Sequence, residues 1–353
     1  MEWSMEELLR RAHDSNVSDI HMTAKSPIMF RVRGELQAQS ASPLEPGHTE
    51  AAARKLMTDE QFEAFDRAGD IDFAYSLEGK RRFRVNAYRQ SGAVALAIRP
   101  IGASVPGMEQ LGLPAAAERF IARRQGLLLV TGPTGSGKST TLAAMIGRIN
   151  ETFRGHIVTL EDPIEYVHSH RSCIVNQREI GSDTQSFASG LRAALRQDPD
   201  VILVGEMRDL DTIRTAITAA ETGHLVLATL HTEGAPQAVD RMIDVFPAEQ
   251  QQQIRFQLSG TLVGVISQRL LPSADGTGMA AAFEVLVNTP AVANLIRSNK
   301  GHQLRSAIQT GGIDGMQTMD AAIRRLVSTG AVTPQAARRC LEGLNTGDQL
   351  KWE

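Results

Sequence analysis

Alternating apolar and polar positions in the first hundred residues predict a small antiparallel sheet with helices beside it. Residues 4–14 form a predicted helix in which Ser4 is the N-cap and Glu7 completes a capping box. This part of the chain is therefore expected to be an α+β domain over residues 1–100. The other predicted elements are a polar helix over 48–68 and strands over 19–22, 28–33, 71–77, 82–88 and 94–99.

The pattern changes after a segment with three prolines and three glycines between residues 100 and 114, which predicts a linker over 101–114. Short, continuous apolar strands separated by helical stretches then predict a parallel sheet covered on both faces. We expect an α/β domain over residues 115–353 with a helical C-terminal part, because apolar residues from about 240 onward recur every four positions. The predicted strands are 127–131, 157–160, 201–204 and 225–230, and the four-residue spacing involves Ile254, Leu258, Leu262 and Ile266.

Composition excludes several classes of protein. The 37 Lys and Arg against 40 Asp and Glu give a net charge of -3, so no global basic field would hold nucleic acid. The two cysteines, Cys173 and Cys340, are too few for a disulfide framework or a four-cysteine zinc site. The acidic N-terminus has no apolar core of a secretory signal, and no apolar run approaches the ~20 residues that span a bilayer. We expect a cytoplasmic protein that reaches a membrane only through a partner.

A glycine-rich segment between a predicted strand and a predicted helix matches the P-loop pattern. Backbone N–H groups in such a loop bind phosphate, and the positive end of the following helix dipole adds to the attraction. Lys138 is expected to reach the β- and γ-phosphates, and the Ser139 hydroxyl to ligate Mg²⁺. The predicted ligand is therefore ATP with Mg²⁺, and the predicted binding residues are Gly132, Pro133, Thr134, Gly135, Ser136, Gly137, Lys138, Ser139 and Thr140.

Acidic residues follow two of the apolar strands, where parallel sheets bind their ligands. One strand is followed by Glu161, Asp162 and Glu165. The other resembles a Walker B strand, except that Gly205 replaces the usual Asp and leaves Glu206 as the carboxylate. One carboxylate is expected to handle Mg²⁺ and its water while another orients the attacking water, because phosphoryl transfer depends on positioning and charge stabilisation.

Histidines and arginines supply further candidates. His231 ends a predicted strand, where it could contact the γ-phosphate, and His224 begins the same strand. Strand alternation places Arg82 and Arg84 on the face opposite to Phe83 and Val85, and Arg99 lies on another strand of the same domain. These guanidinium groups suit either a phosphate-gripping role or a solvated face.

Taken together, the motifs resemble the type IV pilus retraction ATPases, the PilT family of secretion-superfamily motors, over nearly the whole chain. The matching stretches are RFRVNA at 82–87, GPTGSGKSTT at 132–141, EDPIEYVH at 161–168, DPDVILVGEMRD at 198–209, TAAETGHLVLATLHT at 218–232, VFPAE at 245–249, and residues 306–318.

The resemblance implies a PAS-like N-terminal domain, a RecA-like ATPase domain and a ring of six subunits. It implies that Glu165 polarises the attacking water, that Glu206 is the Walker B carboxylate, and that His224 and His231 form a histidine box. It also implies that arginines approach nucleotide across a subunit boundary, the candidates being Arg82, Arg84 and Arg99. The expected partners are further copies of the chain, an inner-membrane pilus platform protein and a paralogous pilus ATPase.

The chain departs from the family in one place. The family's signature Ala-Ile-Arg-Asn-Leu-Ile-Arg corresponds here to AVANLIR at residues 291–297, so Ala293 stands where the family has arginine. This leaves open an accessory, nucleotide-binding ring subunit as an alternative to a retraction motor. A RecA-like nucleic-acid translocase is a second alternative, against which the net charge and the 5% aromatic content argue. The lack of a four-cysteine zinc motif favours retraction over extension.

Overall fold

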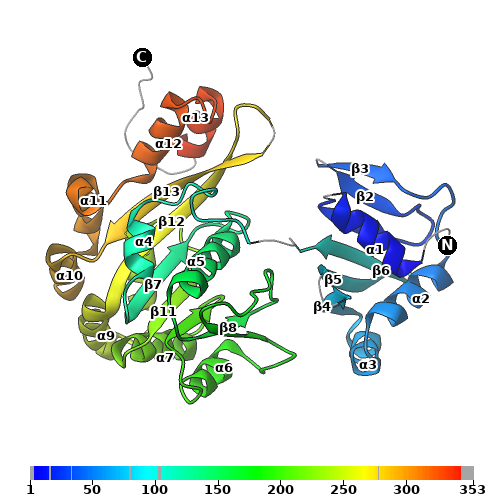
Figure 1. The fold of residues 1–353 in the computed structure, drawn as a ribbon, viewed down its shortest axis with the longest axis horizontal. Helices are drawn as coiled ribbons and strands as arrows, with labels where there is room; N and C mark the ends of the chain where they lie inside the picture. The colour runs from blue at the N-terminus through cyan, green and yellow to red at the C-terminus, as the bar shows by residue number, and fades with distance from the viewer. Residues whose placement is uncertain are drawn as a thin grey trace. The chain divides into compact units, whose positions relative to one another are not determined.

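The computed structural model describes residues 4–15, 17–32, 34–78, 81–101, 105–276 and 278–342. The chain divides into two compact units (Figure 1). The first comprises residues 1–104 with 163–167, and the second comprises residues 105–162 with 168–353. Residues 102–104 of the predicted linker, and Arg33 at the end of a predicted strand, lie outside the described residues.

The first unit is a six-stranded antiparallel sheet with three helices, which confirms the predicted α+β class of this part of the chain. The strands lie in the order β3-β2-β1-β6-β5-β4. Their side chains form one core with α1, α2 and α3, in which Leu9, Ile20, Phe65, Phe83 and Ile98 are fully buried. The elements are α1 (Met5–Asp14), β1 (Asp19–Met22), β2 (Met29–Val32), β3 (Glu35–Ala38), α2 (Pro46–Leu56), α3 (Asp59–Ala68), β4 (Asp70–Leu77), β5 (Arg81–Gln90) and β6 (Ala93–Pro100).

Two predictions for this unit are wrong. The single helix predicted over 48–68 is two helices, because Met57 has extended backbone angles and Thr58 begins α3 with a capping box to Gln61. The strand β3 is not predicted, since all four of its residues are exposed and no alternation of burial marks it. The capping box between Ser4 and Glu7 at the start of α1 is confirmed.

The second unit is built on a seven-stranded sheet in the order β13-β12-β7-β11-β10-β8-β9 (Figure 1). All neighbouring strands are parallel except the β12–β13 pair. The elements are α4 (Ala116–Ile121), β7 (Gly126–Thr131), α5 (Lys138–Thr152), β8 (His156–Glu161), β9 (Ile174–Glu179), α6 (Phe187–Ala194), β10 (Val201–Val204), α7 (Leu210–Glu221), β11 (Leu225–Leu230), α8 (Ala235–Asp244), α9 (Ala248–Thr261), β12 (Leu262–Pro272), β13 (Met279–Val287), α10 (Pro290–Arg297), α11 (Leu304–Thr310), α12 (Met319–Ser328) and α13 (Pro334–Glu342).

Helices cover both faces of this sheet, which explains why its central strands are apolar throughout. Every residue of β7, β10 and β11 is buried. Alternate residues of β7 illustrate the two cores: Leu128 and Val130 pack with α4 and α5, while Leu127 and Leu129 pack with α7, α8 and α9. The predicted α/β fold class, a parallel-rich P-loop sheet preceded by a smaller α+β unit, is confirmed.

The helical prediction beyond residue 240 fails over two strands, β12 and β13, and Leu262 and Ile266 lie in β12 and not in a helix. A spacing of four residues places side chains on one face of a helix and also on one face of a strand, so the pattern does not separate the two. The segment is a strand because it pairs with β7 on one side and β13 on the other, and Gly264 lets it pass close to Phe120, whose ring would lie 2.5 Å from a Cβ at this position. Helices α12 and α13 then pack against the β12–β13 hairpin (Figure 1).

None of the helices in the described ranges combines the length and apolar character needed to cross a membrane.

Candidate nucleotide site

The loop after β7 has the backbone shape of a phosphate cradle. Gly132, Gly135 and Gly137 have φ values of 144°, 79° and 86°, a region that L side chains rarely adopt. A Cβ at Gly132 would also lie 2.3 Å from the carbonyl oxygen of Gln268. Helix α5 begins directly afterwards at Lys138, so its N-terminal N–H groups lie at the end of the loop.

Lys138 turns back onto this loop. Its Nζ donates to the carbonyl oxygens of Gly132, at 2.9 Å, and Pro133, at 3.0 Å. The side chain is buried, with 8% of the residue exposed. These carbonyl contacts hold the ammonium group beside the concave side of the loop, where a phosphate oxygen could exchange with them.

Buried hydroxyl groups test whether a phosphate fits this cradle. Within the part of the chain that the structure describes, no hydrogen-bond partner reaches the Oγ of Ser136 or the Oγ1 atoms of Thr131 and Thr232. A buried hydroxyl without a partner costs about 1–3 kcal/mol, which a bound acceptor would offset. Ser139, in the first turn of α5, is exposed and free to reach a metal ion. The residues present therefore fit a nucleotide phosphate with its cation.

Two residues that support the cradle were not predicted. The buried side chain of Gln268, on β12, accepts from the Thr141 hydroxyl at 2.7 Å, one turn into α5. Its Nε2 would also lie 2.9 Å from a Cβ at Gly137. Because 127 residues separate Thr141 from Gln268, no local sequence pattern links them.

Glu206 and His231 come together at the ends of neighbouring strands, β10 and β11. His231 Nε2 lies 2.8 Å from Glu206 Oε1, and Arg208 Nε lies 2.5 Å from the same oxygen. The Nδ1 of His231 lies 3.4 Å from the Thr134 hydroxyl of the P-loop. The Glu206 carboxylate raises the pKa of Arg208 above its ordinary value, chiefly through their hydrogen bond. One carboxylate, an imidazole and a P-loop hydroxyl thus form a connected group.

The structure explains why glycine stands at position 205, where a Walker B strand usually carries Asp. The Gly205 N–H donates to the Leu160 carbonyl oxygen at 2.8 Å. A Cβ at this position would lie 3.0 Å from that oxygen, closer than ordinary contact. The carboxylate is therefore carried one residue later, by Glu206.

The other acidic segment begins at Glu161, the last residue of β8. Its Oε1 accepts from the Thr159 hydroxyl at 2.6 Å and from Gln177 Nε2 at 3.0 Å. Glu165 lies four residues further on, in the segment 163–167 that belongs to the first unit. The chain re-enters the second unit at His168, whose N–H donates to Gln177 Oε1 at 2.8 Å.

Burial lowers the pKa of His168 from 6.5 to about 4, with a smaller contribution from Arg171. Between these two values the unfolded chain binds a proton that the folded chain does not, so stability falls as pH falls. We expect the free energy of unfolding to decrease by about 2 kcal/mol from pH 7 to pH 5 on this account. Urea titrations at both pH values should show the decrease, and His168→Gln should reduce it. An equal pH dependence in this variant would contradict the assignment.

His224 lies at the amino ends of the parallel strands, whereas the P-loop follows the carboxyl end of β7. Its carbonyl oxygen accepts from the N–H of Gly126, the first residue of β7, and its Nδ1 lies 2.9 Å from the Ala219 carbonyl oxygen. The P-loop follows the other end of β7, and six residues of strand span roughly 20 Å. His231 is therefore the histidine at the phosphate end, and His224 is bound to the end of α7.

The three candidate arginines lie in the first unit. As predicted, Phe83 and Val85 are buried while Arg84 is exposed and Arg82 is half-buried. Arg84 and Arg99 are direct partners across the β5–β6 ladder. Arg84 lies 3.7 Å from Asp72, and Arg99 lies 2.8 Å from Asp19. Both guanidinium groups are thus exposed, and their carboxylate partners differ: Asp72 is exposed, whereas Asp19 is largely covered and also pairs with Arg31.

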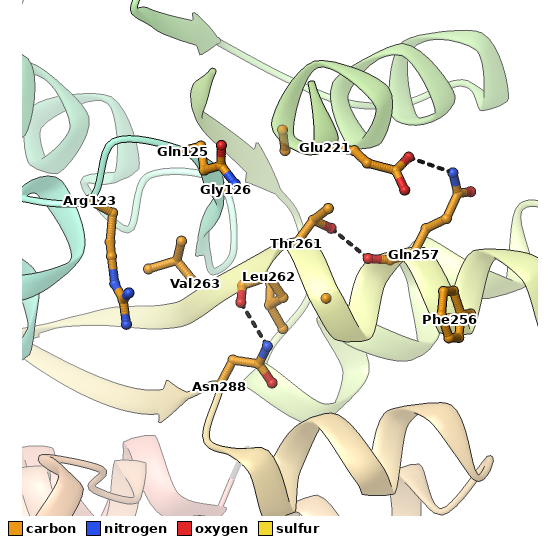
Figure 2. Close-up of a pocket in the computed structure, with 12 residues that line it drawn as sticks. Arg123, Gln125, Gly126, Glu221, Phe256, Gln257, Thr261, Leu262, Val263 and Asn288 are labelled. Carbon is orange, nitrogen blue, oxygen red and sulfur yellow. Dashed lines mark hydrogen bonds between the residues drawn. The ribbon is translucent and has the colours of Figure 1, made fainter. Parts of the chain in front are cut away.

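A cavity of about 450 Å³ lies beside the amino ends of β7 and β12. Figure 2 shows Arg123 and Phe256 at its wall, with Gln257 donating to Glu221 and Asn288 donating to the Leu262 carbonyl oxygen. Gly126 lines it as well, which places it at the end of β7 away from the P-loop. The cavity is separate from the phosphate cradle.

Comparisons with known proteins agree with this geometry. Residues 1–342 match the family described as type II/IV secretion system protein. The chain is 48% identical to the type IV pilus retraction ATPase PilT of Pseudomonas aeruginosa, covering 94% of this chain and 96% of that protein. It is 42% identical to the type IV pilus ATPase PilU of the same organism, over 94% and 87%. A crystal structure of the pilus retraction motor PilT with bound ADP is similar with a TM-score of 0.89 and 46% identity, over 96% of both chains. The resemblance that the motifs indicated is confirmed, and the chain belongs to the type II/IV secretion system protein family.

Proposed function

We propose that this chain is the subunit of a hexameric ATPase motor that powers type IV pilus retraction, and with it twitching motility. The observation that carries the proposal is a complete phosphate cradle, with Glu206 and His231 beside it, in a chain similar to a retraction ATPase over nearly all of its length. Hydrolysis of ATP would drive domain motion that removes pilin subunits from the pilus base.

The nucleotide is proposed to be ATP with Mg²⁺. The N–H groups of the P-loop and of the α5 N-terminus would hold the phosphates, and Lys138 would exchange its two carbonyl partners for phosphate oxygens. Ser139 and Glu206 would hold the cation, which supplies positive charge against the charge that develops on the phosphates. The ADP in the PilT crystal structure supports a nucleotide at this loop.

Hydrolysis is proposed to use two carboxylates in different roles. Glu165 would accept a proton from the attacking water. Glu206, which contacts both His231 and Arg208, would help to hold the cation beside the phosphates. His231 would contact the γ-phosphate and change its contacts when that phosphate is lost, because it lies next to both Thr134 of the P-loop and Glu206. The geometry of the second unit supports the Glu206 and His231 roles, and the Glu165 role rests on the family's acidic motif.

The proposed partners follow from the same motifs. Arg82, Arg84 or Arg99 would reach the nucleotide of a neighbouring copy, so the subunits would meet through unlike surfaces and close into a head-to-tail ring. The ring would act in the cytoplasm on an inner-membrane platform protein, beside a paralogous pilus ATPase. No nucleic acid is needed for this activity.

Glu165→Gln is expected to retain nucleotide binding and to lose hydrolysis by about 10²–10⁴-fold, since the substitution keeps the size of the side chain and removes its basicity. Steady-state ATPase assays and binding of a fluorescent ADP analogue measure the two properties. Cells that carry the allele should extend pili without retracting them. Normal retraction in such cells would overturn the motor proposal and favour an accessory ring subunit.

Matched variants separate the two carboxylate roles. Glu118→Gln removes a surface carboxylate that pairs with Arg148, and it should leave turnover unchanged. Glu206→Gln should weaken the Mg²⁺ dependence of binding as well as turnover. Full activity of Glu165→Gln together with an inactive Glu206→Gln would show that the roles are assigned in the wrong order.

A further inference from the structure

We propose that Gln177 is a positioning residue for hydrolysis, because its amide holds together the two ends of the segment that carries Glu165. The proposal rests on the function proposed above. Gln177 Oε1 accepts from the backbone N–H of His168 at 2.8 Å, and Nε2 donates to Glu161 Oε1 at 3.0 Å. The five residues 163–167, which belong to the first unit, are thus flanked by Glu161 and His168, and both of these flanking residues contact the side chain of Gln177.

The sheet fixes Gln177 in this place. Strand β9 pairs with β8 in parallel, and Gln177 lies opposite Thr159 in the register. The Thr159 hydroxyl donates to the same oxygen of Glu161 at 2.6 Å. The Glu161 carboxylate is thus oriented by donors from two strands, and the half-buried amide of Gln177 extends that arrangement to His168.

The consequence for catalysis is geometric. A segment whose two ends are held by one side chain confines Glu165 to a smaller volume than the same segment without that contact, because a longer loop samples more conformations. Displacing a catalytic group by about 1 Å can cost 10²-fold in rate without changing how substrate is bound. The loss of Gln177 should therefore lower kcat and leave nucleotide affinity unchanged.

Gln177→Glu tests this with almost no change in shape. The new carboxylate can still accept from the His168 N–H, but it loses the Nε2 donor and places a second negative charge beside the Glu161 carboxylate. We expect kcat to fall at least tenfold, with the Kd of a fluorescent ADP analogue within twofold of the wild-type value. Repulsion between the two carboxylates should displace the side chain at 177 and weaken its bond to the His168 N–H, so amide hydrogen exchange at His168 should also accelerate. Asn176→Asp, the same change one residue earlier on β9 at an exposed position, is the matched control and should behave as wild type.

A double-mutant cycle tests whether the contact between Gln177 and Glu161 is the one that affects kcat. In a Glu161→Gln background the amide at position 161 can donate to the carboxylate of Gln177→Glu, so the same substitution should cost no more than twofold. An equal cost in both backgrounds would overturn the proposal. Gln177→Met, which keeps the length and lacks both hydrogen bonds, supplies a second test should Gln177→Glu fold poorly, with the same expected loss of kcat.

Activity measurements on variants of Glu165 and of Gln177 separate the roles of the two residues. An inactive Glu165→Gln with full activity in Gln177→Glu and Gln177→Met would overturn the role of Gln177 alone. A fully active Glu165→Gln would remove Glu165 as the base, and the positioning role would fall with it. A parallel loss of thermal stability, ADP binding and kcat in Gln177→Met would show that the residue serves only packing.

Discussion

Lys138→Ala is expected to abolish ATP turnover. The ammonium group is the cation that the P-loop itself supplies, and the structure holds it against the loop carbonyls of Gly132 and Pro133. Without it, charge that develops on the β- and γ-phosphates has no fixed counter-charge from the loop. A coupled ATPase assay on the purified variant measures the loss, and thermal unfolding with circular dichroism verifies that the buried substitution leaves the fold intact.

Lys300→Ala is the control for this experiment, because Lys300 is an exposed lysine of the same unit. Its turnover should match that of the wild type. Turnover by a folded Lys138→Ala at the wild-type rate would show that hydrolysis takes place elsewhere in the chain. Loss of turnover with retained Mg²⁺-dependent ADP binding would be consistent with a lysine that acts mainly on charge developing during the reaction.

Hydrolysis is also expected to depend on assembly, because the proposed arginines act on the nucleotide of another copy. Arginine fingers contribute about 10³–10⁵ in rate in other phosphoryl-transfer systems. At least one of the alanine variants of Arg82, Arg84 and Arg99 should lose turnover on this scale while keeping its fold and its ADP affinity. Specific activity should rise with protein concentration until rings form, which sedimentation can follow in parallel with the ATPase assay.

Arg54→Ala provides the matched control, since Arg54 is an exposed arginine of the same unit that pairs with Glu50 on α2. Neither Arg84 nor Arg99 is committed to a buried ion pair, so their removal should cost little stability. Activity per subunit that stays constant through dissociation to monomers would exclude a contribution across the subunit boundary. Mixing Lys138→Ala with the affected arginine variant should restore partial activity, because each subunit can supply what its neighbour lacks.

The P-loop was predictable because its chemistry is local. Three glycines, a lysine and a hydroxyl stand within eight positions after an apolar strand, and the positive φ of each glycine is a property of the loop backbone itself. The central strands were predictable for a similar reason, since burial on both faces makes them continuously apolar. The edge strands β3 and β9 carry exposed side chains, and neither was predicted.

The residues that support the site could not be predicted in this way. Gln177 and Gln268 are glutamines with no distinctive neighbours, and their roles depend on strands that meet only after folding. Their partners, His168 and Thr141, lie 9 and 127 residues away. Arg208 is an intermediate case: it lies two residues after Glu206 in a recognised motif, yet its contact with that carboxylate is seen only in the structure.

Gly205 has a mechanical consequence for the two acidic segments. Because no side chain separates it from Leu160, the ends of β8 and β10 remain in direct backbone contact, and the Thr229 hydroxyl ties β11 to the Gly205 carbonyl oxygen at 2.5 Å. Glu161 and Glu206 therefore follow strand ends that are hydrogen-bonded to each other, so the backbone separation of the two residues is fixed by the sheet. Any motion that brings the acidic groups together or apart during a cycle must arise in the segment after Glu161 or in side-chain rotation, and not from strands sliding past one another.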